Sequence, residues 1–228
     1  MRRGLYPTVG DSFSANGLVA QQGFNLIEIM ISVAIIGIFL GIGIPAIGDW
    51  IQNRQVNVLA ESIASGMRLA QTEAVQRNVP IDMVFTSSDV TGVTNPASAT
   101  LTVGGLATTD QPPNWMVRVA GDTTSAGFVQ GKTGADGSGN ARFSGPAGVS
   151  FSPLGRLSAS IAVDGTTTPP VGNVVFQIVN PSVQSGNGTL RCVYVGIGGA
   201  VRVCDPRAVS PDARACVPPL AAGACPPS

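Results

Sequence analysis

Apolar residues gather in one block near the start of the chain. From Phe24 to Gly48 the sequence reads FNLIEIMISVAIIGIFLGIGIPAIG and carries a single charged residue, Glu28. A helix that crosses a bilayer needs about 20 mostly apolar residues, and this block is long enough. Arg2 and Arg3 precede it, and positive charge before an apolar stretch favours retention of that end in the cytoplasm. The block therefore predicts one membrane-spanning helix.

After the block the pattern changes to that of a helix with one buried face. Between Asp49 and Asn78 the apolar residues recur every three or four positions, and charged residues occupy the other faces. Pro80 predicts the end of this helix. We therefore expect one long helix from Phe24 to about Asn78, whose second half covers a folded domain. The residues expected on its buried face are Val56, Leu59, Ile63, Met67, Ala70 and Ala74.

From Pro80 onward, short segments rich in β-branched and aromatic residues alternate with Gly, Pro, Ser, Thr and Asn. Such a series predicts an antiparallel sandwich, or two small sheets, against the helix. The fold class is thus α+β, with a long N-terminal helix (transmembrane, then amphipathic) packed on an antiparallel β-sandwich-like C-terminal domain. Loops are expected at Ser87–Asn95, Gly121–Ala126, Gly131–Pro146 and Asp164–Val171. The expected strands are Ile81–Thr86, Thr100–Val103, Trp115–Ala120, Phe128–Gln130, Gly148–Ser152, Leu157–Val163, Asn173–Val179, Leu190–Val195 and Ala200–Cys204.

The overall composition narrows the classes of function. The chain has 228 residues with 13 Lys and Arg, 13 Asp and Glu and no His, so its formal net charge is zero. Without imidazole there is no Ser-His-Asp triad, Cys-His pair or His-ligated zinc. No nucleophile motif marks a catalytic site, so we expect neither an enzyme nor a cofactor. Zero net charge argues against strong binding of a polyanion, although it leaves room for a local basic patch.

Glu28 is the feature that a plain membrane anchor does not explain. A carboxylate inside an apolar segment is costly and usually has a partner. A secretory signal peptide would have a shorter apolar region followed by a small-residue cleavage site, which this block lacks. The stretch GFNLIE, from Gly23 to Glu28, resembles instead the type III signal of type IV pilins and type II secretion pseudopilins. In that signal a Gly and a Phe stand before a Glu and a long apolar helix.

The resemblance implies that residues 1–23 are a leader. A prepilin peptidase would cut between Gly23 and Phe24 and methylate the new N-terminus at Phe24. The cationic amine of Phe24, in the same or a neighbouring subunit, would then neutralise Glu28 in an apolar filament core. Such a pair fixes axial register more than it adds stability, so Glu28 is assigned to subunit docking. The implied partners are other pilins or pseudopilins through the N-terminal helix, the prepilin peptidase, the inner-membrane assembly platform and membrane lipid.

Pro45 lies within the apolar block. Proline removes a backbone donor and bends a helix, so we expect a kink here. In related pilins a proline at this place marks a bend or local melting. The alternative is a membrane helix that tolerates proline near its exit.

Three further stretches resemble the FimT/GspH branch of minor pilins. They are the helix-to-strand junction SGMRLAQTEAVQRNVPI, the turn FSPLGR at Phe151–Arg156 and the glycine hairpin at Leu190–Cys204. With the N-terminal signal, the resemblance covers most of the chain from Phe24 to Cys204. The expected domains are a leader (1–23), a transmembrane or filament-core helix (24–48), its amphipathic half (49–79), a β-rich periplasmic domain (80–204) and a Pro/Ala-rich, Cys-containing tail (205–228).

Four cysteines, Cys192, Cys204, Cys216 and Cys225, lie at the C-terminal end. None is in a CxxC motif, and without His a zinc site would need all four thiolates at unusual spacings. Disulfides therefore fit better, no metal is expected, and an oxidising compartment such as the periplasm is implied. With Gly198 at the centre of the hairpin turn, Cys192 and Cys204 face each other, which favours a bridge between them and a second bridge, Cys216–Cys225, in the tail. The other two pairings, Cys192–Cys216 with Cys204–Cys225 and Cys192–Cys225 with Cys204–Cys216, stay open.

Some FimT-like minor pilins contribute to DNA uptake through a Gly-Arg-x-Arg motif near the last hairpin. Here the matching positions read GAVR from Gly199, so only Arg202 carries over. The candidate contacts to double-stranded DNA are Arg191, Arg202, Arg207 and Arg214. A few arginines give weak binding at physiological salt. The alternative is that these arginines are solvated or pair with nearby aspartates.

Taken together, the sequence favours a minor type IV pilin of the FimT kind that takes part in pilus assembly or priming. A minor pseudopilin of a type II secretion system, of the GspH kind, is the close alternative, and a DNA-binding receptor at a pilus tip is another. In each case the chain would cross the bacterial inner membrane once, with its C-terminal domain in the periplasm, and would be assembled into a pilus or pseudopilus.

Overall fold

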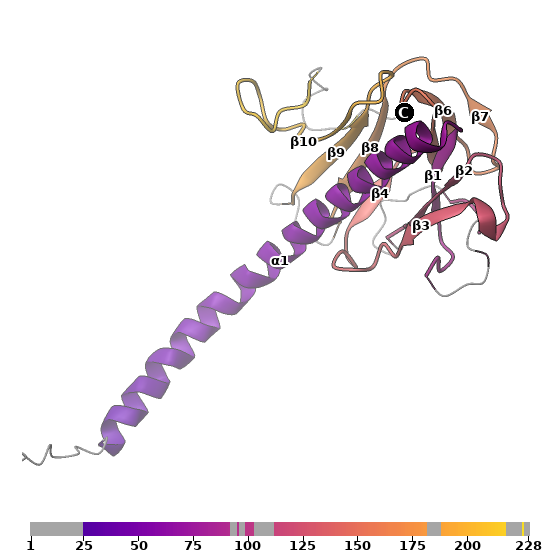
Figure 1. Cartoon of the computed structure of the whole chain (residues 1–228). Coiled ribbons are helices and arrows are strands. Elements are labelled where there is room, and N and C mark those ends of the chain that lie inside the picture. The colour runs from indigo at the N-terminus through magenta and orange to yellow at the C-terminus, as the bar shows by residue number, and fades with distance from the viewer. Residues whose placement is uncertain are drawn as a thin grey trace, which may run out of the picture. The chain divides into compact units, whose positions relative to one another are not determined.

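The computed structural model describes residues 25–91, 95, 99–102, 112–181, 188–217 and 225. The chain divides into two compact units, Met1–Ile44 and Pro45–Ser228. Helix α1 spans Leu26–Arg77 and contributes to both units (Figure 1). The long helix that the apolar block and the following periodicity predict is therefore confirmed.

Local interactions and residue types determine where α1 begins and ends. At its start, the carbonyl oxygen of Asn25 accepts the backbone N–H groups of Glu28 at 2.9 Å and of Ile29 at 3.3 Å. At its end, Asn78 adopts a φ of 54°, the left-handed conformation that closes many helices. Pro80 follows two residues later and has no N–H with which to continue the helix. The helix thus ends where Pro80 predicts.

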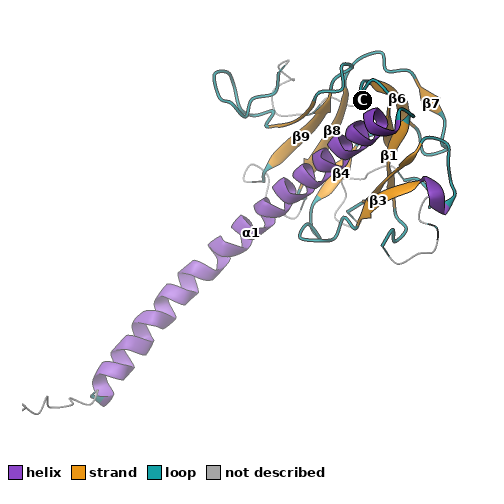
Figure 2. Ribbon diagram, viewed as in Figure 1, coloured by secondary structure: helices purple, strands orange, loops and turns teal. Residues whose placement is uncertain are grey.

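Besides the helix, the described part of the second unit contains two antiparallel sheets (Figure 2). The first sheet has the strand order β3-β2-β1-β5-β6-β7, and the second has the order β10-β9-β8-β4. Their strands are β1 (Ile81–Thr86), β2 (Asn114–Val119), β3 (Phe128–Lys132), β4 (Arg142–Ser144), β5 (Gly148–Phe151), β6 (Leu157–Ile161), β7 (Thr167–Thr168), β8 (Val174–Val179), β9 (Leu190–Val195) and β10 (Val201–Cys204). This arrangement confirms the α+β class and the prediction of two small sheets against the helix.

Most of the predicted strands are present within a residue or two of their expected ends. The segment around Thr100 is different: it contributes an isolated bridge between Thr86 and Leu101, and Val103 lies outside the described residues. Two strands were missed, because β4 and β7 fall in segments expected to be loops. A short 3₁₀ helix, Ser125–Gly127, also overlaps one of these segments. All of these differences involve elements of four or fewer residues.

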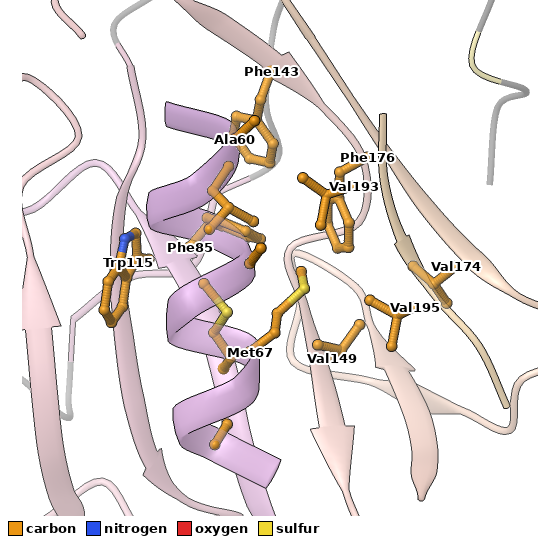
Figure 3. Packing of buried hydrophobic residues seen from close by; sticks show 14 of the residues in the cluster. Ala60, Met67, Phe85, Trp115, Phe143, Val149, Val174, Phe176, Val193 and Val195 are labelled. Atoms are coloured by element: carbon orange, nitrogen blue, oxygen red, sulfur yellow. The ribbon is translucent and has the colours of Figure 1, made fainter. Parts of the chain in front are cut away.

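The second half of α1 lies between the two sheets and shares one core with both (Figure 3). Every side chain predicted on its buried face is fully buried, including Met67, which packs in the core. Gly66 allows close approach, since a Cβ there would lie 2.8 Å from Cε of Met83. Trp115 donates from its indole to the hydroxyl of Ser62 at 3.0 Å, which ties the first sheet to the helix. Three aromatic rings bring the two sheets together around this helix: Phe85, Phe143 and Phe176.

Candidate functional site

The first unit presents an apolar helical surface. Between Leu26 and Leu40, the large apolar side chains of α1 are all between 48% and 75% exposed, and they occupy every side of the helix. A helix that is apolar all round is normally buried in a membrane or among other helices. Among the residues whose side chains the structure describes, no helix is both long and apolar enough to cross a membrane. None of the described residues covers this surface, so it calls for apolar partners.

Glu28 is the charged residue of this surface. It lies in the first turn of α1 and is exposed, and its backbone carbonyl accepts the hydroxyl of Ser32 at 2.7 Å. Its carboxylate therefore stands among apolar side chains and is available to a cation brought by another molecule or by the chain's own N-terminus. The predicted cleavage and methylation residues, Gly23 and Phe24, lie outside the described residues.

Pro45 lies where the helix assignment is continuous. Its side chain is outside the described part of the structure, so the kink stays a prediction. 

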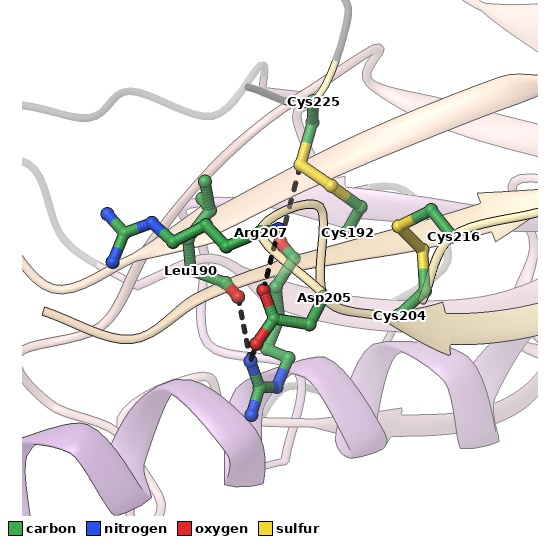
Figure 4. Close-up of a disulfide and its surroundings, with 8 residues drawn as sticks. Leu190, Cys192, Cys204, Asp205, Arg207, Cys216 and Cys225 are labelled. Carbon is green, nitrogen blue, oxygen red and sulfur yellow. Dashed lines mark hydrogen bonds and ion pairs between the residues drawn. A yellow bond between two sulfur atoms is a disulfide. The ribbon is translucent and has the colours of Figure 1, made fainter. Parts of the chain in front are cut away.

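The four cysteines form two disulfides, as expected, but the favoured pairing is wrong. The bridges join Cys192 to Cys225 and Cys204 to Cys216 (Figure 4). This is one of the two pairings that the sequence left open. The Sγ atoms of Cys192, Cys204 and Cys216 lie within 4.8 Å of one another, so the two bridges are neighbours.

The hairpin register explains why the favoured bridge does not form. Cys192 and Cys204 do face each other, as predicted from the turn at Gly198. Gly196 donates its N–H to the carbonyl of Ala200, and hydrogen-bonded pairs alternate along an antiparallel hairpin. Cys192 and Cys204 are thus a hydrogen-bonded pair, whose Cβ atoms stand about 5.5 Å apart. A disulfide needs about 3.8 Å, so each strand cysteine bonds instead to a cysteine of the tail.

The described part of the tail, residues 205–217 and Cys225, covers the outer face of the second sheet. Around both disulfides, Tyr194, Leu190 and Val175 form a small buried cluster that is separate from the main core. Asp205 extends this cover, since its N–H donates to the carbonyl of Arg214 at 2.7 Å in a parallel bridge. The bridges thus fasten residues 205–217 and Cys225 over an apolar surface.

Two of the four candidate DNA contacts are paired with carboxylates. Nη1 of Arg191 lies 2.6 Å from Oδ2 of Asp205, and its side chain is only 17% exposed. Nη2 of Arg214 lies 2.8 Å from Oδ2 of Asp212, and hydrogen bonds from Arg214 lower the pKa of Asp212 to about 2. For Arg191 and Arg214, the structure therefore shows the alternative that the sequence left open, which is pairing with aspartates.

The other two candidates are exposed. The guanidinium of Arg207 donates to the carbonyl of Gly188 at 2.7 Å and has no carboxylate partner among the described residues, whereas its backbone N–H donates to Oδ1 of Asp205 at 2.9 Å. Arg202 lies on β10 opposite Tyr194 of β9, and within the described part of the chain its guanidinium has neither a hydrogen-bond nor an ion-pair partner. The free positive charge at this end thus comes down to Arg202 and Arg207.

Sequence reasoning missed one junction. The two turns singled out by motif meet at the end of α1, where Nε2 of Gln71 donates to the carbonyl of Gly155 at 2.7 Å. A Cβ on Gly199 would lie 2.0 Å from that same carbonyl oxygen. The glycines in both turns, at Gly155 and Gly199, were the available signal, because each adopts a positive φ.

Comparison with known proteins shows relatives among type IV pilins. The chain is 34% identical over 83 residues to the type IV major alpha-pilin of Moraxella bovis, covering 36% of this chain and 52% of that protein. It is 45% identical over 56 residues to the type IV major fimbrial protein FimA of Dichelobacter nodosus, covering 25% of this chain and 34% of that protein. The chain thus spans about half of the first relative and a third of the second. No protein-family model matches the chain.

Among solved structures, the type IV minor pilin FimU of Pseudomonas aeruginosa is similar with a TM-score of 0.42 and 13% identity. That match covers 68% of this chain and 91% of FimU. The identities to the pilins confirm the resemblance to type IV pilins that the sequence indicates. The named relatives are pilins and fimbrial proteins, and none of these names describes an enzyme.

Proposed function

We propose that this chain is a minor type IV pilin of the FimT kind, which crosses the bacterial inner membrane once and takes part in pilus assembly or priming. In this proposal the prepilin peptidase removes residues 1–23 and methylates Phe24. The apolar part of α1 then leaves the lipid through the assembly platform and joins the filament core. The β-rich domain stays on the periplasmic side and becomes the outer part of the subunit.

The observation that carries this proposal is the apolar surface of α1 with its one carboxylate. From Leu26 to Leu40 the exposed side chains are apolar on every side, and Glu28 stands among them. Exposed apolar patches this large mark membrane or protein contacts. Lipid satisfies the apolar side chains but not the carboxylate, whereas a packed helix with a cationic N-terminus satisfies both. The two disulfides support an oxidising compartment for the C-terminal domain.

Glu28→Ala is the test of docking. We expect the variant to enter the membrane normally, because it makes the apolar block more apolar. We expect its share in sheared filaments to fall at least tenfold, because removal of one partner leaves the buried amine of Phe24 unpaired at a cost of about 3 kcal/mol. Immunoblots of membrane and filament fractions measure both quantities.

Glu73→Ala is the matched control, since Glu73 is a glutamate of the same helix beyond the apolar block, where it pairs with Arg77 one turn later. It should enter filaments like the wild type. If Glu28→Ala entered filaments as well as Glu73→Ala does, the docking role would be refuted.

A minor pseudopilin of a type II secretion system would use the same helix and the same carboxylate. Deletion of the gene, followed by twitching, transformation and secretion assays in one strain, separates the two systems. We expect loss of twitching with intact secretion. Loss of secretion alone would assign the chain to a pseudopilus instead.

A further inference from the structure

The outer edge of β10 offers backbone groups to another strand. β10 is the last strand of its sheet, paired on one side with β9. Because Gly196 donates to Ala200, the alternation of the hairpin directs the N–H and C=O of Arg202 toward β9. The same groups of Val201 and Val203 therefore point away from the sheet.

Both ends of this edge are already occupied. At one end, Nη2 of Arg68 donates to the carbonyl of Val201 at 3.4 Å. At the other end, the tail pairs with Asp205, whose N–H bonds to the carbonyl of Arg214. Between them, the N–H of Val201 and both backbone groups of Val203 have no partner among the residues that the structure describes. Natural proteins usually cover or blunt such edges.

A groove of about 400 Å³ runs along these open groups. One wall is the helix, with Glu61 and Arg68, and the other is the tail around Ala213. Four charges line it, two positive and two negative, so the groove has no net charge. Its charged lining residues are Glu61, Arg68, Arg202 and Asp212.

We propose that this groove receives a short extended segment of a neighbouring pilin-like subunit, which adds a strand to β10 alongside Val201–Val203. The identity of the neighbour rests on the function proposed above. An antiparallel segment would exchange two hydrogen bonds with Val203 and accept one from the N–H of Val201. The positive and negative side chains that line the groove would favour oppositely charged side chains on the bound segment.

The charges distinguish a peptide from a nucleic acid at this place. Phosphates gain affinity from an excess of Lys and Arg, whereas here Glu61 lies 3.9 Å from Arg68 and Asp212 pairs with Arg214, which leaves Arg202 as the single unpaired charge of the described lining. The open N–H and C=O groups alternate at strand spacing, which an extended peptide backbone matches and a phosphate backbone does not. The groove therefore fits a peptide segment.

Val203→Pro tests the added strand. Proline removes the outward N–H of Val203 and leaves the bonds of Arg202 and Cys204 to β9 intact, as edge strands tolerate. Val203→Ala is the matched control, because it loses the same side chain and keeps the N–H. Both are made in the full chain, with the photocrosslinker p-benzoylphenylalanine in place of Ala213 at the wall of the groove.

The measurement is the yield of crosslinks between this chain and other pilin subunits in sheared filaments, identified by mass spectrometry. We expect a crosslink to an extended segment of a neighbouring subunit, with about tenfold lower yield in Val203→Pro than in Val203→Ala. Thermal unfolding of both full chains in detergent checks that the fold is kept. Equal yields in the two variants, no crosslink to a subunit, or a crosslink to DNA would each overturn the added strand.

Failure of this inference is distinguishable from failure of the proposed function. If the chain is absent from the filament fraction altogether, the pilin function itself is refuted. If the chain is present there and its crosslinks do not depend on the N–H of Val203, only the added strand is refuted.

Discussion

At the scale of single residues, Gly199 is a position that only glycine fits. It adopts a φ of 92° in the β9–β10 turn, a backbone conformation that residues with a side chain rarely adopt. A Cβ there would lie 2.0 Å from the carbonyl oxygen of Gly155 and 2.5 Å from Nε2 of Gln71. Gln71 in turn holds that carbonyl by a hydrogen bond. One glycine thus lets two turns and the helix end come together.

Gly199→Ala should therefore destabilise the folded domain. We expect a loss of at least about 2 kcal/mol in the free energy of unfolding, from left-handed strain and overpacking together. Urea unfolding of the full chain in detergent, followed by tryptophan fluorescence, measures it. Gly198→Ala is the control, because a Cβ at Gly198 meets nothing within 4 Å, and it should change stability by less than about 0.5 kcal/mol. Equal effects of the two substitutions would contradict the close approach at Gly199.

At the scale of elements, the tail is part of the second sheet's packing. The sheet buries one face against α1 and the other under the tail, with Tyr194 and the two disulfides in the outer cluster. Arg191 connects these parts, since it pairs with Asp205 of the tail and also donates to Oδ1 of Asn57 on α1 at 2.9 Å. The tail is therefore held by covalent bonds, an ion pair and apolar burial at once.

The two bridges should differ in what they contribute. Cys192–Cys225 closes a loop of 33 residues, and Cys204–Cys216 closes one of 12. A longer loop restricts the unfolded chain more, so replacing the first pair by Ser should cost about 4 kcal/mol and the second about 3 kcal/mol. Urea unfolding of the two double variants in detergent compares them directly. A larger loss from the shorter bridge would contradict this order.

The sequence could predict the elements in which residues of one kind recur at a regular spacing. The buried face of α1 followed from three- and four-residue spacing, and the register of the β9–β10 hairpin followed from its glycine turn at Gly198. β4 could not be predicted this way, because its three residues form a strand only by pairing with β8, as Phe143 does with Ile178. The two-residue β7 likewise exists only through β6.

Some features of the candidate site could likewise be predicted from the sequence, and others could not. Glu28 could be singled out because a charge within an apolar block is visible in the sequence. The disulfide pairing depends on which way the backbone groups of Cys192 and Cys204 point, and the free edge at Val203 depends on where the tail lies. Neither leaves a local pattern in the sequence, so both required the structure.

At the scale of the whole molecule, the zero net charge hides an uneven distribution of apolar and charged residues between the two units. Apolar side chains dominate the described helix of the first unit, whereas 11 of the 13 basic and 11 of the 13 acidic residues lie in the second unit. There the ion pairs of Arg191 and Arg214 with aspartates remove two of the four arginines proposed for DNA. What the molecule can offer to a polyanion is therefore far less than its arginine count suggests.

Duplex DNA binding should reflect this small charge. We expect the full chain in detergent to bind DNA only at low salt, with log K falling against log salt at a slope of about −2, because Arg202 and Arg207 alone would release counterions. Arg202→Ala should halve that slope, and Arg77→Ala, which removes an arginine already paired with Glu73 at 2.6 Å, should leave it unchanged. Fluorescence anisotropy across a salt series gives the slope. A slope near −4 would mean that the pairs of Arg191 and Arg214 open to meet phosphate, and no binding at low salt would remove DNA from the roles of this chain.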